Sequence, residues 1–149
     1  MTHTVHPYAH RLGIIRDWRS RWFGVKAKYK ENLKGDVLIY EYLKKRLKGA
    51  FVNSIEIERG VKTFRIIIES SRPGFIIGRS GEGMIKLRDD VIRFMTRRKL
   101  NIKEELKIDV KEVKSPESSA MIAAQMVAEG LEKRMPFRRV MKTMIEKAF

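Results

Sequence analysis

The sequence predicts an α+β fold, in which helices pack on one face of a three-stranded β-sheet. The chain has 149 residues and is 43% hydrophobic, which is enough for one ordinary domain with a core. Apolar residues repeat at every second position in three segments, and at every third or fourth position in several others. A glycine-rich stretch follows the second of the strand-like segments. These patterns divide the chain into an arm over residues 1–34, a folded domain over 35–114 and a helical segment over 115–149.

The arm over residues 1–34 mixes aromatic and basic side chains without a clear period. It contains eight basic and two acidic residues and both tryptophans of the chain. We expect an extended arm with one short helix. Such a mixture is typical of segments that stack on RNA bases and contact phosphates; the alternative is that Trp18, Trp22 and Phe23 pack on the folded domain. The candidate RNA contacts of the arm are Arg11, Arg16, Arg19 and Arg21.

The folded domain is predicted to begin with a helix over residues 37–48. Asp36 follows Gly35 and can cap the helix N-terminus, and Gly49 supplies a stop signal. Apolar residues at every fourth position, namely Ile39, Leu43 and Leu47, form its buried stripe.

Alternation of apolar and polar residues, as at Ile55 and Ile57, Phe64, Ile66 and Ile68, and Leu106, Ile108 and Val110, predicts three strands, over residues 52–58, 63–69 and 106–111. The turn signal Arg59-Gly60 separates the first two strands.

A helix is predicted over residues 82–98, before the third strand. Its evidence is that Met84, Leu87 and Val91 fall on one helical face. A further helix is predicted to open with Ser115 as N-cap and Pro116 at its first position, and a last amphipathic helix to cover residues 137–149.

The charge of the chain points to a polyanionic partner. The formal net charge is +15, and a protein that neutralises phosphates gains affinity by releasing counterions. The chain has no cysteine, which excludes disulfides, thiolate metal ligands and a cysteine nucleophile. Its longest apolar run has five residues and its N-terminus lacks an apolar signal, so we expect a cytosolic protein with no membrane partner.

The sequence Gly78-Arg79-Ser80-Gly81 stands between a short apolar turn and the helix over residues 82–98. Glycines at both ends let the backbone approach a nucleic-acid backbone closely, and the following helix N-terminus offers free N–H groups. Arg79 adds a full charge at the tip, and Lys86 lies one turn further on. This is the pattern of the GXXG loop of KH domains, which clamps single-stranded RNA. The alternative is a glycine-rich turn without a ligand.

The order of elements favours the KH interpretation. A helix and a strand precede the strand, short helix, GXXG loop, long helix and strand of the core, which is the type II KH arrangement. We therefore predict a type II KH RNA-binding domain over residues 35–114. The basic residues Arg93, Arg97, Arg98 and Lys99 end the long helix, complement its dipole and are interpreted as a solvated face.

No catalytic or cofactor site is predicted. The three histidines His3, His6 and His10 lie in the arm without a carboxylate beside them, so we predict no metal. Asp89 and Asp90 are adjacent on a helix and point about 100° apart, which prevents them from facing one substrate together. We expect no cofactor and no enzymatic activity.

Several motifs occur in order from one end of the chain to the other. The first are Val5-His6-Pro7, Arg11-Leu12-Gly13-Ile14 and Trp18 with Trp22-Phe23. The central ones are the run RPGFIIGRSGE, which begins at Arg72, and Lys86-Leu87-Arg88. The last is MPFRRVMK, which begins at Met135. Together they resemble bacterial ribosomal protein three of the small subunit, a KH-domain protein of the subunit head.

The resemblance implies a structural protein of the small-subunit head in the cytoplasmic ribosome. Its partners would be small-subunit ribosomal RNA, mRNA and neighbouring head proteins. In that family, residues matching Arg138, Arg139 and Lys142 face mRNA as it enters its channel and assist its unwinding. The family continues with a sheet that completes a second domain, so residues 115–149 resemble the helical start of an incomplete second domain. Gly83 also departs from the family pattern and is expected to loosen the first helical turn slightly.

Two other functions stay open at the level of sequence. The first is a ribosome assembly or regulatory factor built on the same KH module. The arm makes this function less favoured, since a stand-alone KH factor has no need of such an arm. The second is an RNA-processing enzyme, which is disfavoured because the sequence shows no plausible catalytic group.

Overall fold

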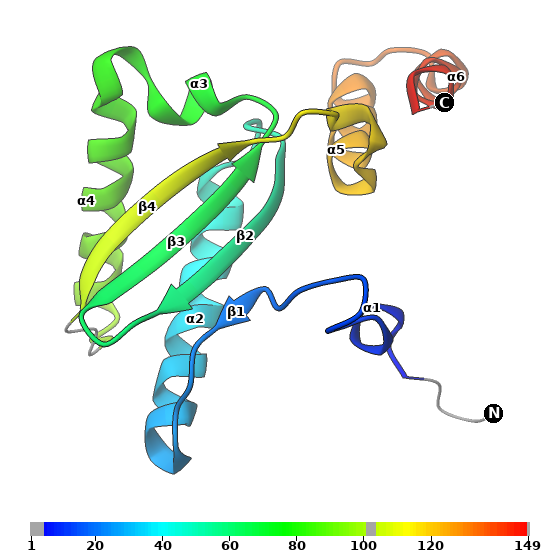
Figure 1. Cartoon of the computed structure of the whole chain (residues 1–149). Coiled ribbons are helices and arrows are strands. Elements are labelled where there is room, and N and C mark those ends of the chain that lie inside the picture. The colour runs from blue at the N-terminus through cyan, green and yellow to red at the C-terminus, as the bar shows by residue number, and fades with distance from the viewer. Residues whose placement is uncertain (1–4, 101–103, 149) are drawn as a thin grey trace.

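The computed structural model describes residues 5–100 and 104–148, and its central feature is a four-stranded sheet with the order β1-β2-β3-β4 (Figure 1). β1 and β2 are parallel, β2 and β3 antiparallel, and β3 and β4 parallel. The strands are β1 (Ser20–Arg21), β2 (Val52–Arg59), β3 (Thr63–Ser70) and β4 (Glu105–Glu112). The helices are α1 (Pro7–His10), α2 (Lys26–Arg46), α3 (Pro73–Ile77), α4 (Glu82–Arg97), α5 (Ala120–Glu132) and α6 (Phe137–Ala148).

Helices α2 and α4 cover one face of the sheet, and the hydrophobic core lies between them and the strands (Figure 1). Ile39 and Leu43 of α2 and Val91 of α4 are fully buried, as are Phe64 and Ile66 on β3. Burial of each such side chain stabilises the fold by roughly 1.5–3 kcal/mol. The predicted α+β fold with helices on one face is confirmed, and so are the three predicted strands. Among the described residues, no helix is both long and apolar enough to cross a membrane.

The sheet has one strand more than the sequence predicts. β1 contains only Ser20 and Arg21, which pair with Ile57 and Glu58 on the outer edge of β2. The Ile57 N–H also donates to the Arg19 carbonyl at 3.0 Å. A two-residue strand cannot show alternation, so only its backbone pairing with a distant segment reveals it.

The predicted start of the first long helix, at residue 37, is wrong. α2 begins at Lys26, so Gly35 and Asp36 lie inside the helix and are buried. Asp36 does not cap the helix; it pairs with Arg59 of β2, whose Nε lies 2.9 Å from Asp36 Oδ1. Gly35 fits beside the same arginine, because a Cβ there would lie 3.4 Å from Arg59 Nη2. The Gly-Asp pair that resembles a helix start therefore serves a contact across the core.

The C-terminal helices pack at the end of the sheet where β2 begins (Figure 1). Pro116 opens a 3-10 turn over Pro116–Ser118, and the extended Ser119 separates it from α5, so the predicted helix starts at Ala120. The Gln125 amide donates to the Val52 carbonyl at 2.8 Å. α6 packs on α5 where Val140 meets Gly130, since a Cβ on Gly130 would lie 3.0 Å from Val140 Cγ1. Phe149, the last residue of the predicted helix, lies outside the described residues.

Candidate nucleic-acid interface

The GXXG loop joins α3 to α4 through three residues in left-handed backbone conformations. φ is +71° at Gly78, +54° at Ser80 and +82° at Gly81. Glycine adopts positive φ angles without the steric cost of a Cβ, which explains both glycines of the motif, and Ser80 takes up the third such angle at the tip. The Arg79 and Ser80 side chains are exposed at the tip. The structure therefore brings the four predicted loop residues together on one tight, solvent-facing turn.

Gly83, on the first turn of α4, permits the close approach of α3 to α4. A Cβ on Gly83 would lie 2.5 Å from the Ile76 carbonyl oxygen and 2.8 Å from that of Ile77, and both oxygens belong to the backbone. Gly78 is confined as well, although less tightly, because its Cβ would lie 3.0 Å from the Gly83 nitrogen. Gly83 therefore has a packing role that the sequence did not show: it lets the loop fold back against the start of α4.

A groove of about 380 Å³ runs between the first turns of α4 and the free edge of β4. Its apolar residues suit the faces of bases, and its basic residues suit phosphates, although two carboxylates also line it. The lining residues are Met84, Ile85, Arg88, Glu105, Leu106, Lys107, Ile108 and Asp109. Lys86 is exposed on the same helix, and its Nζ lies 3.7 Å from Glu82 Oε2 in a pair that is open to solvent.

Three of the predicted arm arginines lie near α1. The guanidinium carbons of Arg16 and Arg19 stand 5.1 and 4.7 Å from the ring centre of Tyr8. Arg11 Nη1 donates to the Pro7 carbonyl at 2.9 Å. All three side chains are exposed, and among the described residues none pairs with a carboxylate. Arg16 and Arg19 thus stand over an aromatic ring and Arg11 lies at the end of α1, which is a combination of basic and aromatic side chains suited to RNA.

Arg21, the fourth predicted arm contact, is engaged within the protein. Its guanidinium meets Glu56 Oε2 at 2.6 Å, Asp17 Oδ2 at 2.8 Å and Glu58 Oε1 at 2.9 Å. Glu56 and Glu58 are 35 and 37 residues away in sequence, so local pattern could not show these partners. The contacts fix β1 to β2, and they leave Arg21 with little unpaired charge to offer a phosphate.

Trp22 fixes the arm to the folded domain from the other side. Its ring lies 5.2 Å from that of Tyr29, and its indole nitrogen is buried. Burial raises the pKa of Asp36 above its ordinary value, while Arg59 and the Trp22 indole N–H act in the opposite direction. Trp18 and Phe23 are 58% and 88% exposed. Of the three aromatic residues that could pack on the domain, only Trp22 is partly buried; the other two are exposed.

The predicted mRNA-facing residues Arg138, Arg139 and Lys142 are all exposed on α6. Their spacing places them on one side of the helix. The nearest carboxylate contact recorded for them is that of Lys142 Nζ with Glu146 Oε1, at 3.9 Å. The apolar side chains of α6 differ in exposure. Val140 is buried against α5, whereas Phe137, Met141 and Ile145 are more than half exposed. The structure does not bring this basic group together with the GXXG loop.

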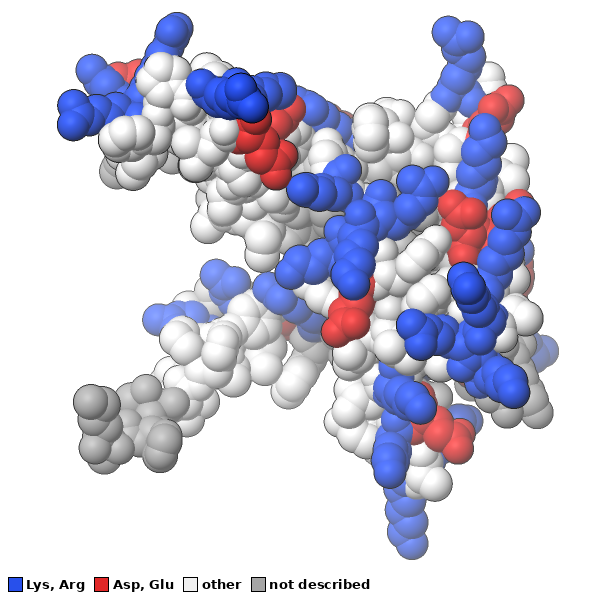
Figure 2. Space-filling model, turned by 180° about the vertical axis from the view of Figure 1, so that it is seen from behind, with Lys and Arg blue, Asp and Glu red and all other residues white. Residues whose placement is uncertain are grey.

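The back of the molecule, where α2 and α4 lie, carries many lysine and arginine side chains (Figure 2). Sequence reasoning interpreted Arg93, Arg97 and Arg98 only as a solvated helix end, and all three are exposed. It missed the groove beside β4, because a groove between a helix and a strand edge has no local sequence signal. Among the described residues there is no group of three metal-ligating side chains; His3 lies outside them.

Comparison with known proteins supports the architecture. The family model described as KH domain matches residues 38–118. The chain is 43% identical to small ribosomal subunit protein uS3 of Campylobacter hominis over 148 residues, and 41% identical to the protein of that name in Xanthomonas euvesicatoria. It is 40% identical over 146 residues to that of Coxiella burnetii. These alignments cover 98–99% of this chain but only 58–61% of the relatives, so the chain spans about three fifths of their length.

The matched region begins within α2 and ends in the turn before α5, so it contains the sheet from β2 onward, the GXXG loop and α4. The order of these elements is that of the type II arrangement. The predicted resemblance to ribosomal protein three of the small subunit is likewise confirmed by its relatives. The glycine loop, the groove and the topology thus have one common explanation: the chain belongs to the KH domain family.

Proposed function

We propose that the chain is a structural, RNA-binding constituent of the small ribosomal subunit head, with small-subunit ribosomal RNA as its main partner. The GXXG loop carries this proposal: two glycines with positive φ present an exposed arginine at the start of a long helix. The names of the relatives support the ribosomal assignment, and the net charge of +15 supports a polyanionic partner. The cytoplasmic ribosome follows as its location.

The loop would act on the RNA backbone. Gly78 and Gly81 let the chain approach sugar and phosphate closely, and the α4 N-terminus directs free N–H groups and the positive end of its dipole outward. Arg79 adds a charge-assisted contact, Ser80 a hydroxyl, and Lys86 a second charge one turn along α4. The bases would then lie along the groove between α4 and β4.

The arm would provide a second contact with ribosomal RNA. Arg16 and Arg19 stand over the Tyr8 ring, Arg11 follows α1, and all three side chains are exposed, so they can reach phosphates. Arg21 was also predicted as an RNA contact; its three carboxylate partners favour a role in positioning the arm instead.

Arg138, Arg139 and Lys142 would face mRNA at the channel through which it enters. Their exposure and shared side of α6 support this role. As phosphate contacts they would bind without regard to base sequence. Residues 115–149 would be the helical start of a second domain, and the exposed Phe137, Met141 and Ile145 are suited to the rest of that domain or to neighbouring head proteins.

Sedimentation of a cell lysate in a sucrose gradient tests the proposal. A ribosomal constituent should migrate with small subunits even in high salt, because it is held by many contacts. An assembly or regulatory factor with the same KH module should dissociate in high salt or follow only immature particles. An RNA-processing enzyme should sediment mostly apart from subunits, and either of these two results would overturn the proposal.

A further inference from the structure

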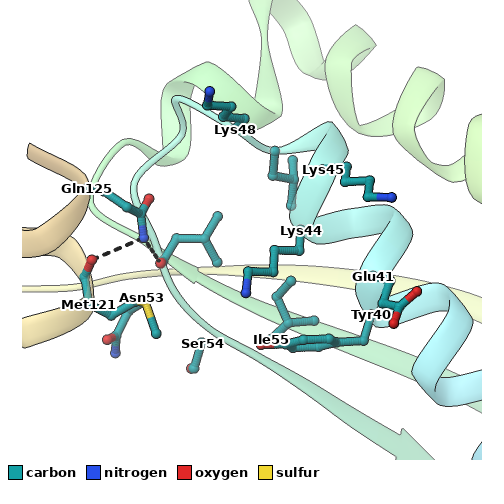
Figure 3. Close-up of a pocket in the computed structure, with 12 residues that line it drawn as sticks. Tyr40, Glu41, Lys44, Lys45, Lys48, Asn53, Ser54, Ile55, Met121 and Gln125 are labelled. Carbon is teal, nitrogen blue, oxygen red and sulfur yellow. Dashed lines mark hydrogen bonds between the residues drawn. The ribbon is translucent and has the colours of Figure 1, made fainter. Parts of the chain in front are cut away.

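A second groove, of about 670 Å³, lies on the opposite edge of the sheet from the GXXG loop (Figure 3). Its walls come from the C-terminal half of α2, the start of β2 and the first turns of α5. The lining residues are Tyr40, Glu41, Lys44, Lys45, Leu47, Lys48, Val52, Asn53, Ser54, Ile55, Met121 and Gln125. Neither the KH loop nor the arm arginines reach it, so the proposed RNA function leaves it unused.

The floor of this groove is a free strand edge. β1 pairs with β2 only at Ile57 and Glu58, so β2 has no neighbour on that side before them among the described residues. The Ile57 N–H points outward, to the Arg19 carbonyl. Because strand directions alternate, the N–H and carbonyl of Ile55 point to the same edge. The open stretch ends where the Gln125 amide binds the Val52 carbonyl, as Figure 3 shows.

The walls favour apolar side chains, and the rim favours negative charge. Tyr40 and Lys44 extend from α2 toward β2, and Leu47, Ile55 and Met121 contribute apolar surface (Figure 3). Three lysines and one glutamate line the groove, so its charge is net positive. Lys48 pairs with Glu132 at 3.2 Å, whereas Lys44 and Lys45 have no carboxylate partner among the described residues.

We propose that this groove binds an extended acidic peptide segment of a partner protein, which adds to the free edge of β2 as a short strand. Strand addition uses backbone hydrogen bonds for affinity and pockets for alternate side chains for selectivity. Alternate apolar residues would face Tyr40 and Leu47, and an Asp or Glu would meet Lys44 and Lys45. An RNA strand fits less well, because it lacks the regularly spaced N–H and C=O groups with which a β-strand pairs along a sheet edge. The arm of the same chain fits less well, because its net positive charge opposes that of the rim.

Selection from a phage-displayed library of random peptides, each about nine residues long, tests the proposal on the full chain. The selected peptides should alternate apolar residues and carry Asp or Glu. Peptide binding, measured by fluorescence anisotropy, should weaken about tenfold or more in Lys44→Glu/Lys45→Glu. The matched control Lys28→Glu/Lys30→Glu makes the same charge change near the start of α2, outside the groove, and should change affinity by no more than about twofold. The Ile55 amide should become protected from hydrogen exchange when peptide binds.

Three results would overturn the proposal. The first is a selection that yields no peptide with a preference for the unmodified chain over the Lys44→Glu/Lys45→Glu variant. The second is a bound peptide that leaves the Ile55 amide unprotected, which would exclude strand addition. The third is a ten-uridine RNA that displaces the peptide and itself loses affinity in the same variant, which would make the groove a nucleic-acid site.

Discussion

Single residues decide how the GXXG loop works. Arg79 and Ser80 are exposed, and Ser80 adopts φ of +54°, a region that Asp and Asn tolerate better than most residues. Arg79→Asp/Ser80→Asp should therefore preserve the fold and place negative charge where phosphate is expected. We predict weaker binding of small-subunit RNA with an unchanged far-UV circular dichroism spectrum.

A matched variant separates loop contact from total charge. Lys114→Asp/Ser115→Asp makes the same change of three charges at an exposed site after β4. It should weaken RNA binding less than the loop variant, as measured by filter binding at fixed salt. Equal losses in the two variants would mean that the loop acts only through overall charge.

Gly83 illustrates a glycine required by packing. Alanine is the better helix former by about 1 kcal/mol, yet its Cβ would lie 2.5 Å from a backbone carbonyl oxygen that cannot move freely. We predict that Gly83→Ala lowers the free energy of unfolding by about 1–3 kcal/mol, as measured by urea denaturation. Gly74→Ala is the control, because nothing lies within 4 Å of its Cβ and it should be neutral or slightly stabilising.

The Asp36–Arg59 pair is a buried contact between α2 and β2. The two side chains are only 6% and 5% exposed, and the Arg59 guanidinium also lies 4.4 Å from the ring centre of Phe64. Arg59→Met would leave the carboxylate buried without its partner, and it should destabilise the fold by about 3–5 kcal/mol. Arg65→Met removes a half-exposed arginine of β3 and should cost less than about 1 kcal/mol.

The pH dependence of the Arg59→Met variant gives a second readout. The pKa of Asp36 is already raised by burial, and loss of Arg59 should raise it further. A carboxyl with a raised folded-state pKa contributes stability below its unfolded pKa of about 3.9 and loses it as pH rises through the folded value. The stability gap between variant and unmodified chain should thus narrow as pH falls from neutral toward 4. If the difference in free energy of unfolding between the two proteins does not change with pH, the unpaired Asp36 carboxylate is not the cause of the destabilisation.

At the scale of elements, the arm has an inner part that belongs to the fold and an outer part that does not. β1 pairs with β2, and the buried residues of α2 all lie between Gly35 and Leu43, whereas α1 has four residues, none of them buried. We predict strong amide-exchange protection in the free chain at Ile57 and from Gly35 to Leu43, with rapid exchange over residues 7–16. Protection of α1 equal to that of the core would show that the whole arm is prefolded.

The basic side of α6 should act as a set of phosphate contacts. Replacement of Arg138, Arg139 and Lys142 by alanine should reduce the log–log salt slope for binding of unstructured RNA to the assembled subunit by roughly 0.7 per lost contact. Alanine at Lys26, Lys28 and Lys30 removes the same charge from the start of α2 and serves as control. Identical slopes for unmodified and α6-variant subunits would exclude the contact.

For the whole molecule, positive charge is spread over several surfaces. The GXXG loop and α6 lie apart from each other beyond the same end of the sheet, and the helical side carries further lysines and arginines (Figures 1 and 2). Such a distribution suits a protein enclosed by RNA on several sides better than one that binds a single strand. The groove beside β2, on the edge away from the loop, leaves room for a protein neighbour as well.

Local pattern was sufficient for most elements and for the GXXG loop. Alternation at Ile55 and Ile57, and at Phe64 and Ile66, predicted β2 and β3 because these residues face the buried core under the helices. The glycines at 78 and 81 predicted the loop because their backbone angles exclude other residues without strain. These features depend on neighbours in sequence, so sequence alone determined them.

The tertiary structure decided what depends on distant partners. β1 exists because the β2 edge is available to it, and Asp36 lies inside α2, where it pairs with Arg59 across the core instead of capping a helix. From the sequence, Arg21 resembled an RNA contact, whereas the structure shows its carboxylate partners on β2. Gly83 resembled a residue that only weakens the helix, whereas the structure places the Ile76 carbonyl beside it. In each case the residue's role depends on atoms that are distant in sequence and close in space. Burial and charge pairing stabilise a fold only between groups that are in contact, so the sequence pattern near each residue does not show them.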